Sequence, residues 1–113
     1  MLPKLNVWLE KDGDVVLSSW RIRLLEAIAE TGSISAAAEK LGVPYRRAWE
    51  KVQEIEAGLG EKVVETAIGG LHGGGARLTE AGRRAIAQFH AFADGLDAEV
   101  ERRYRQTFGR KRL

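Results

Sequence analysis

Apolar and polar residues first alternate along the chain and then change to a helical period. The stretch LNVWLE at 5–10 has a period of two, with Trp8 on the face opposite its aliphatic side chains, and this predicts a β-strand. The turn residues KDGD follow, and VVLSS at 15–19 predicts the returning strand of a hairpin. A lone hairpin is marginally stable in water, so we expect it to pack on helices or on another chain.

Three helices are predicted between residues 20 and 59. The first, WRIRLLEAIAET, follows the capping residue Ser19 and has an apolar inner stripe. The second, ISAAAEKL, follows Ser33 and ends at Gly42, and the third, PYRRAWEKVQEIEAGL, begins at Pro44. The last two have the spacing of a helix-turn-helix.

Small residues stand where the two helices of this pair cross. Ala38 lies four positions before Gly42, and Ala48 lies six positions after it. A bulky side chain at Ala38 would push the helices apart. The alanines therefore predict a close approach, with the third helix seated on the second.

A helical wheel divides the third helix into a buried and an outward face. Ala48, Val52 and Ile55 define the buried stripe, together with Leu59. The polar positions that point away from it are Arg46, Glu50 and Gln53, flanked by Arg47 and Lys51 on one side and by Tyr45 and Trp49 on the other. Such a face is typical either of a recognition helix, whose Arg46 bridges guanine O6 and N7 while Glu50 accepts from cytosine N4 or orients Arg46, or of a solvated charged surface.

The two aromatic residues on the flank have two interpretations each. Trp49 either packs at the edge of the core or contacts a thymine methyl group or the sugar backbone. Tyr45 has the same two interpretations, and its hydroxyl is able to reach a phosphate.

Five glycines lie within seven residues of the stretch AIGGLHGGGARLTEAG at 67–82. The glycines are followed by ARL and not by the Lys of a phosphate-binding P-loop, so a P-loop is not expected. A dinucleotide-binding fingerprint would need a further strand downstream, and the sequence predicts none there. KVVET and ARL instead predict a hairpin with a thin tip, which directly after a helix-turn-helix is a wing that approaches sugar-phosphate closely. His72 in the tip either contacts a phosphate or a minor groove or has no role, and Arg77 at the base is expected to contact a phosphate.

One long helix is predicted at the C-terminal end, from the capping residue Thr79 to about Phe108. An apolar a/d stripe runs along it, formed by Ile86, Phe89, Ala93, Leu96 and Val100, and Arg103 interrupts it. Tyr104 and Phe108 add apolar area on a neighbouring line. The stripe either pairs with a second copy, giving a homodimer, or packs back on its own domain.

Composition and charge narrow the function classes. The chain has 113 residues, no Cys and a net charge of +2, with thirteen basic against ten acidic residues in 43–113. We expect a cytoplasmic protein with no membrane segment, no cofactor, no metal site and no catalytic residue, because both His residues are isolated and no nucleophile motif is present. The basic tail RRYRQTFGRKRL touches phosphates or is simply solvated.

The motifs GSISAAAEKLGVPYRRAWEKVQEIE and GGLHGGGARLTEAG resemble the N-terminal DNA-binding domain of ModE-type molybdate-responsive transcriptional regulators. LysR-type regulators are more distantly similar through the helix pair and the LTEAG that opens the last helix. The resemblance implies a dimer that binds palindromic double-stranded DNA. Phosphate contacts would come from Ser33 and Ser35, and Tyr45, Arg46 and Arg47 would enter the major groove.

Together these patterns predict a mainly α fold with small β content. Residues 1–78 are expected to form a winged helix-turn-helix domain with an N-terminal β-hairpin, and 79–113 a dimerisation helix with a basic tail. The full-length ModE regulators continue into oxyanion-binding domains, so we expect no molybdate site in this chain. The expected function is sequence-specific regulation of transcription, and the alternative is a protein-interaction module that kept the fold without binding DNA.

Overall fold

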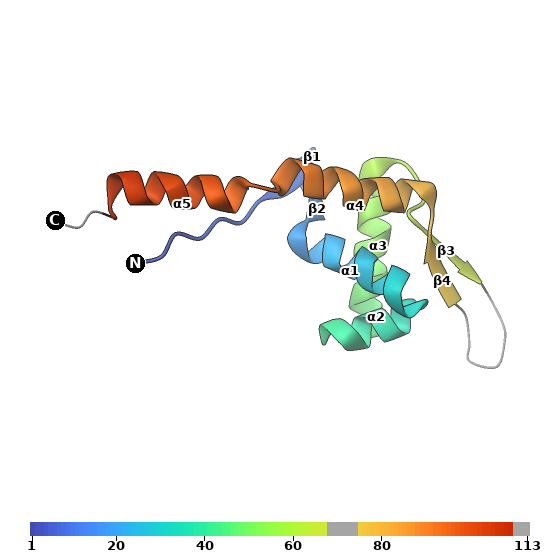
Figure 1. Cartoon of the computed structure of the whole chain (residues 1–113). Helices are drawn as coiled ribbons and strands as arrows, with labels where there is room; N and C mark the ends of the chain where they lie inside the picture. The colour runs from blue at the N-terminus through green and yellow to red at the C-terminus, as the bar shows by residue number, and fades with distance from the viewer. Residues whose placement is uncertain (68–74, 110–113) are drawn as a thin grey trace.

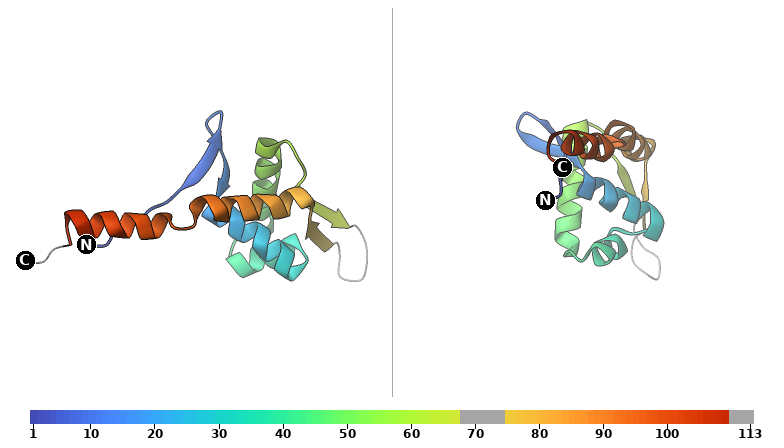
Figure 2. Two further views of the ribbon diagram at one scale, coloured as in Figure 1. Left: turned by 45° about the horizontal axis from the view of Figure 1, so that its top comes forward. Right: turned by 60° about the vertical axis from the view of Figure 1, so that its left-hand side comes forward.

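The computed structural model describes residues 1–67 and 75–109 of the chain (Figure 1). Over these residues the elements follow in the order β1 (Trp8–Lys11), β2 (Asp14–Ser18), α1 (Ser19–Thr31), α2 (Ile34–Leu41), α3 (Tyr45–Leu59), β3 (Val64–Ala67), β4 (Gly75–Leu78), α4 (Glu80–Ala93) and α5 (Leu96–Thr107). The helices α1 to α4 form one body that carries both hairpins, and α5 extends away from it (Figures 1 and 2). This arrangement confirms the predicted winged helix-turn-helix with an N-terminal β-hairpin.

Side-chain caps start three of the helices. The Ser33 hydroxyl accepts a hydrogen bond from the Ala36 amide at 2.9 Å, as predicted for α2, and the Thr79 hydroxyl accepts from the Gly82 amide at 3.1 Å in α4. The prediction for Ser19 was wrong by one residue, because Ser18 caps α1 and Ser19 already lies inside it. The pairing of Ser18 with β1 holds its backbone extended, which is the conformation an N-cap residue needs.

The core is centred on α1 and closed by the helix-turn-helix. Leu24, Leu25 and Ile28 of α1 have no solvent exposure. Ala38 of α2 and Ala48 of α3 are equally enclosed, so the predicted close approach of these two helices is confirmed. Since neither alanine has side-chain bulk beyond Cβ, the N-terminal half of α3 is held directly against α2.

Both hairpins are antiparallel, and in the described residues they form two separate sheets. The first begins later than predicted: β1 starts at Trp8, and an irregularity in the ladder follows Leu9. Every residue of β1 is exposed. The period-two pattern begins before Trp8, but among the described residues no strand pairs with residues 5–7, so they do not extend the ladder. In the second hairpin Val64 pairs with Leu78 and Ala67 with Gly75, as expected for the strands of a wing.

The predicted long C-terminal helix is confirmed over 80–107, with one interruption. Asp94 leaves the helical conformation, and Gly95 adopts a φ of 91°, so α4 ends and α5 begins there. A φ of this sign favours glycine. α5 and the N-terminal segment run side by side beyond the body, and the Tyr104 hydroxyl donates to the Met1 carbonyl at 3.0 Å (Figures 1 and 2).

An ion pair between His90 of α4 and Glu26 of α1 makes part of the stability depend on pH. The hydrogen bond to the Glu26 carboxylate, 2.8 Å from His90 Nε2, raises the pKa of His90 above its ordinary value. The ion pair therefore stabilises the fold fully at pH values below the unfolded-state pKa of about 6.5. Its contribution is lost as the pH rises through the raised pKa of His90 in the folded state. Because both side chains are about half exposed, the effect should be only a few tenths of a kcal/mol.

We therefore expect His90→Gln to melt below the wild type at about pH 5.5 and close to it at about pH 8.5, apart from any pH-independent offset. Thermal denaturation at the two pH values measures this. Glu26→Gln is the matched control and should remove the same pH dependence. A melting difference that stays constant between the two pH values would contradict the assignment.

Candidate nucleic-acid interface

The outward face of α3 carries the side chains that were expected to read base edges. Because Ala48, Val52 and Ile55 are fully buried, Arg46 and Glu50 project to solvent on the opposite side of the helix. Arg47 is exposed as well, and within the described parts of the chain no carboxylate forms an ion pair with Arg46 or Arg47. The predicted outward position of both arginines is confirmed, and both guanidinium groups are available to an external acceptor.

The flanks of the same helix are more engaged with the protein itself. Trp49 is half-buried and packs against the core cluster, which is the packing interpretation of this residue. Lys51 lies 3.4 Å from the Glu54 carboxylate one turn later. Tyr45 stands at the start of α3 with about half of its surface exposed, so its hydroxyl remains free to meet a phosphate.

The N-terminal end of α2 offers a second group of polar contacts. The Ser33 side chain is half-buried and already serves as the helix cap, whereas Ser35 is exposed. The unpaired amides at a helix N-terminus carry partial positive charge and favour an anion such as a phosphate. The position of both serines is therefore compatible with the phosphate contacts predicted for them.

The base of the wing is joined directly to this end of α2. The Ala76 amide donates to the Gly32 carbonyl at 2.8 Å, which fixes β4 against the turn between α1 and α2. Arg77 is highly exposed, and its only ion-pair contact among the described residues is Glu65 across the hairpin, at 3.4 Å. The wing base and the start of α2 thus lie side by side (Figure 1). His72 lies outside the described residues.

The residues predicted to pair two copies divide into two groups at the helix break. Phe89 is buried in the core of its own domain, and Ile86 and Ala93 pack against that core. These three residues therefore pack on their own domain, which was the alternative to pairing with a second copy. Leu96 and Val100 lie on α5 beyond the body and are only half-buried, so pairing through α5 stays a prediction that rests on them.

Two features escaped the sequence analysis although each had a signal. The break at Asp94–Gly95 coincides with an Asp-Gly dipeptide, a common turn signal that the long apolar stripe obscured. The buried Arg21 shares the inner face of α1 with Leu25 and Ile28, at spacings of four and seven residues. A charge on an apolar stripe is the pattern that marks a buried, partnered side chain.

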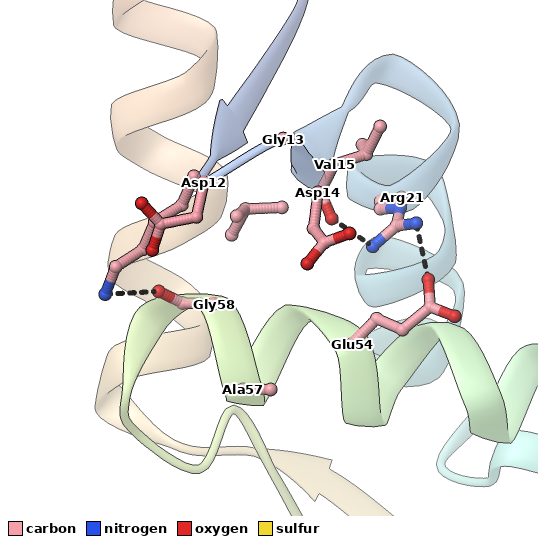
Figure 3. Close-up of a pocket in the computed structure, with 10 residues that line it drawn as sticks. Asp12, Gly13, Asp14, Val15, Arg21, Glu54, Ala57 and Gly58 are labelled. Carbon is pink, nitrogen blue, oxygen red and sulfur yellow. Dashed lines mark hydrogen bonds and ion pairs between the residues drawn. The ribbon is translucent and has the colours of Figure 1, made fainter.

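Among the described residues, no His, Asp or Glu side chains gather in groups of three or more that could hold a metal ion. In the same part of the chain, every helix is too short or too polar to cross a bilayer. A pocket lies away from the outward face of α3, between the β1–β2 turn and the C-terminal half of that helix (Figure 3).

Comparison with known proteins agrees with this geometry. The family model of bacterial regulatory helix-turn-helix proteins of the lysR family matches residues 20–83. The molybdenum-pterin-binding protein MopB of Rhodobacter capsulatus is 46% identical over 91 residues, which are 80% of this chain and 33% of MopB. The molybdenum transport protein ModE of Azotobacter vinelandii is 38% identical over 83% of this chain and 35% of its own length. The DNA-binding transcriptional dual regulator ModE of Escherichia coli K12 is 42% identical over 65% of this chain and 28% of its own length.

Solved structures show the same fold. The CbnR DBD–DNA complex superposes with a TM-score of 0.59 at 26% identity, covering 80% of this chain and 97% of the CbnR chain. The BenM DBD/benA site 1 DNA complex gives a TM-score of 0.59 at 21% identity, covering 83% of this chain and all of the BenM chain. The chain thus covers nearly the whole of these two structures and spans about a third of the length of the MopB and ModE relatives.

Proposed function

The chain belongs to the lysR family of bacterial regulatory helix-turn-helix proteins, and from that premise we propose that it is a sequence-specific, DNA-binding transcriptional regulator of the ModE type that works in the cytoplasm. The observation that carries the proposal is the pair Arg46 and Arg47, which project outward from a helix seated on the alanines of α2. The wing base lies next to the start of α2, the helix on which α3 is seated.

Base readout is assigned to α3 and anchoring to the surrounding polar groups. Arg46 would donate two hydrogen bonds to guanine O6 and N7 in the major groove, with Glu50 accepting from cytosine N4 or orienting Arg46. Phosphate contacts hold the protein in register without reading sequence. The candidates for these contacts are Ser33, Ser35, Tyr45, Lys51 and Arg77, while Arg47 would enter the major groove beside Arg46.

Two copies would be needed to read a palindrome. Pairing through α5 about a twofold axis would place the two α3 helices roughly 34 Å apart, one turn of DNA. Selection of bound duplexes from a random pool tests both parts of the proposal. Enrichment of a palindrome supports readout and symmetry together, whereas no enrichment, or no retention of any duplex at low salt, would contradict it.

Three glutamates on α3, Glu50, Glu54 and Glu56, would suit the alternative of a protein-interaction module because they repel phosphate, but the structure gives two of them internal roles. The Glu56 carboxylate accepts from the Val63 and Val64 amides at 2.9 and 3.2 Å, at the entry to the wing. Glu54 pairs with the buried Arg21 at 2.6 Å. Glu50, one helical turn after Arg46, is exposed on the outward face of α3. Because the charges of Glu54 and Glu56 are engaged by groups of the protein itself, they oppose an approaching phosphate less, and this supports the DNA-binding proposal.

Arg46→Ala is expected to weaken binding to the selected duplex by roughly 1–3 kcal/mol, because a bidentate contact to guanine is lost. It should also relax the preference at one base position of each half-site. Competition binding with the selected duplex and its single-base variants measures both effects. Arg105→Ala is the charge-matched control, since Arg105 is exposed on α5, and its base preferences should be unchanged. Equal weakening on scrambled DNA would show that Arg46 contacts phosphate and reads no base.

A further inference from the structure

A buried cation lies behind the recognition helix. Arg21 of α1 is 8% exposed, whereas arginine is almost never buried to this degree unless it is partnered. Among the described residues, Arg21 is the one charged residue that is buried. Burying a guanidinium group without partners would be costly, so its contacts define which elements are held together here.

The guanidinium group of Arg21 joins three elements (Figure 3). Its Nη1 donates to the Val15 carbonyl of β2 at 3.0 Å, and its Nη2 donates to the Glu54 carboxylate of α3 at 2.6 Å. The fork of donors in arginine suits two acceptors at once, which a lysine ammonium cannot match in the same geometry. Arg21 therefore ties α3 to α1 and to the β1–β2 hairpin through one side chain.

The hairpin is also packed tightly against the C-terminal half of α3. A Cβ atom at Gly58 would lie within 2.7 Å of Val16 Cγ1, so any larger residue there would force the buried Val16 side chain to move. The Lys11 ammonium donates to the Gly58 carbonyl at 3.5 Å (Figure 3). These contacts and the Arg21–Glu54 pair hold the half of α3 that follows the outward-facing Arg46.

We propose that Arg21 is a positioning residue for DNA recognition, which acts through Glu54 to set the angle of α3. The inference rests on the proposed function and deepens it. Eight residues separate Arg46 from Glu54, about 12 Å along the helix axis. A tilt of about 5° at Glu54 would displace Arg46 by roughly 1 Å, which is enough to spoil a bidentate hydrogen bond. Phosphate contacts tolerate such a shift better, because Coulomb attraction varies slowly with distance.

The expected result is a loss of discrimination without a loss of general affinity. Arg21→Met keeps the length and apolar packing of the side chain but removes both hydrogen bonds. Its affinity for the selected duplex should fall roughly tenfold, the size of one lost base contact, while its affinity for a scrambled duplex stays within about twofold. Arg21→Lys should not restore discrimination fully, because one ammonium group cannot serve both acceptors in the same way.

Glu54→Met provides a second variant that separates positioning from folding. Because the Glu54 side chain is about half exposed, the variant is expected to fold even if Arg21→Met does not. It should lower the ratio of the two affinities in the same direction. Arg84→Met is the matched control, since it breaks an exposed ion pair to Glu61 at 2.9 Å and should leave the ratio unchanged. All affinities are measured at a temperature at which circular dichroism shows each variant folded.

The outcomes distinguish failure of this inference from failure of the proposed function. A wild-type chain that prefers no sequence contradicts the proposed function, and the inference with it, before any variant is made. A selective wild type whose Arg21→Met and Glu54→Met variants keep the same ratio overturns the inference alone. Equal weakening on both duplexes would assign Arg21 a role in stability only, and would also overturn it.

Discussion

Gly82→Ala is expected to destabilise the protein by about 2–4 kcal/mol, although the same exchange inside a helix usually stabilises by about 1 kcal/mol. Gly82 lies in the first turn of α4 and is buried. A Cβ atom there would fall on the backbone carbonyl oxygen of Val63, far inside van der Waals contact. That oxygen accepts a hydrogen bond from the Thr79 amide at 3.0 Å, so it cannot move away without a loss.

Urea denaturation of the wild type and the variant measures this difference. Ala87→Gly, at an exposed position of the same helix, is the control, and it should cost only the helix-propensity difference of about 1 kcal/mol. A Gly82→Ala variant as stable as the wild type would show that the segment before the wing shifts freely. The close approach of α4 to Val63 would then not be needed for the fold.

Local periodicity was enough to predict the helix-turn-helix and the outward face of its second helix. Ala38 and Ala48 are recognisable because a crossing of two helices excludes bulk, and Arg46 is placed by counting around a wheel from Ala48. The wing was predictable from two short strand patterns on either side of a glycine-rich stretch of sequence. These features depend on neighbours within a few residues, which a single sequence records.

The contacts that join distant segments were not predictable in this way. The hydrogen bond from Ala76 to Gly32 fixes the wing beside α2, and the pair of Arg21 with Glu54 fixes α3 on α1. Each joins residues more than thirty positions apart through a backbone group or a single charge. Such pairings depend on how the elements pack in three dimensions, and the pattern of apolar residues alone does not specify them.

The C-terminal stripe shows the limit of a periodicity argument. Phe89 and Leu96 belong to the same a/d series, yet Phe89 is buried in its own domain and Leu96 lies beyond the break at Gly95. A repeat of 3.5 residues indicates an apolar face but does not say what covers it. The interruption of the helix decides which part of the face stays available for a partner.

Leu96→Glu is expected to give monomers at micromolar concentration and to weaken binding to a palindromic duplex by roughly 100-fold or more, because the two half-sites would no longer be bound as one unit. In the described structure α5 has no fully buried residue, and it extends away from the body (Figure 2). Isolated helices of this length are marginal in water, and ion pairs from Glu99 to Arg102 and Arg103 stabilise an exposed helix only slightly. The apolar row of Leu96, Val100 and Tyr104 is therefore expected to be covered by a second copy.

Sedimentation velocity and competition binding measure the two effects separately. Ala98→Glu is the matched control, since it adds the same charge to α5 at an exposed position away from Leu96 and should leave both the dimer and its affinity intact. Affinity for a single half-site should be similar in the wild type and in Leu96→Glu, because α3 and the wing base are distant from the substitution. A wild type that sediments as a monomer at micromolar concentration would contradict pairing through α5, whereas a dimeric Leu96→Glu variant would place the contact between copies elsewhere on the chain.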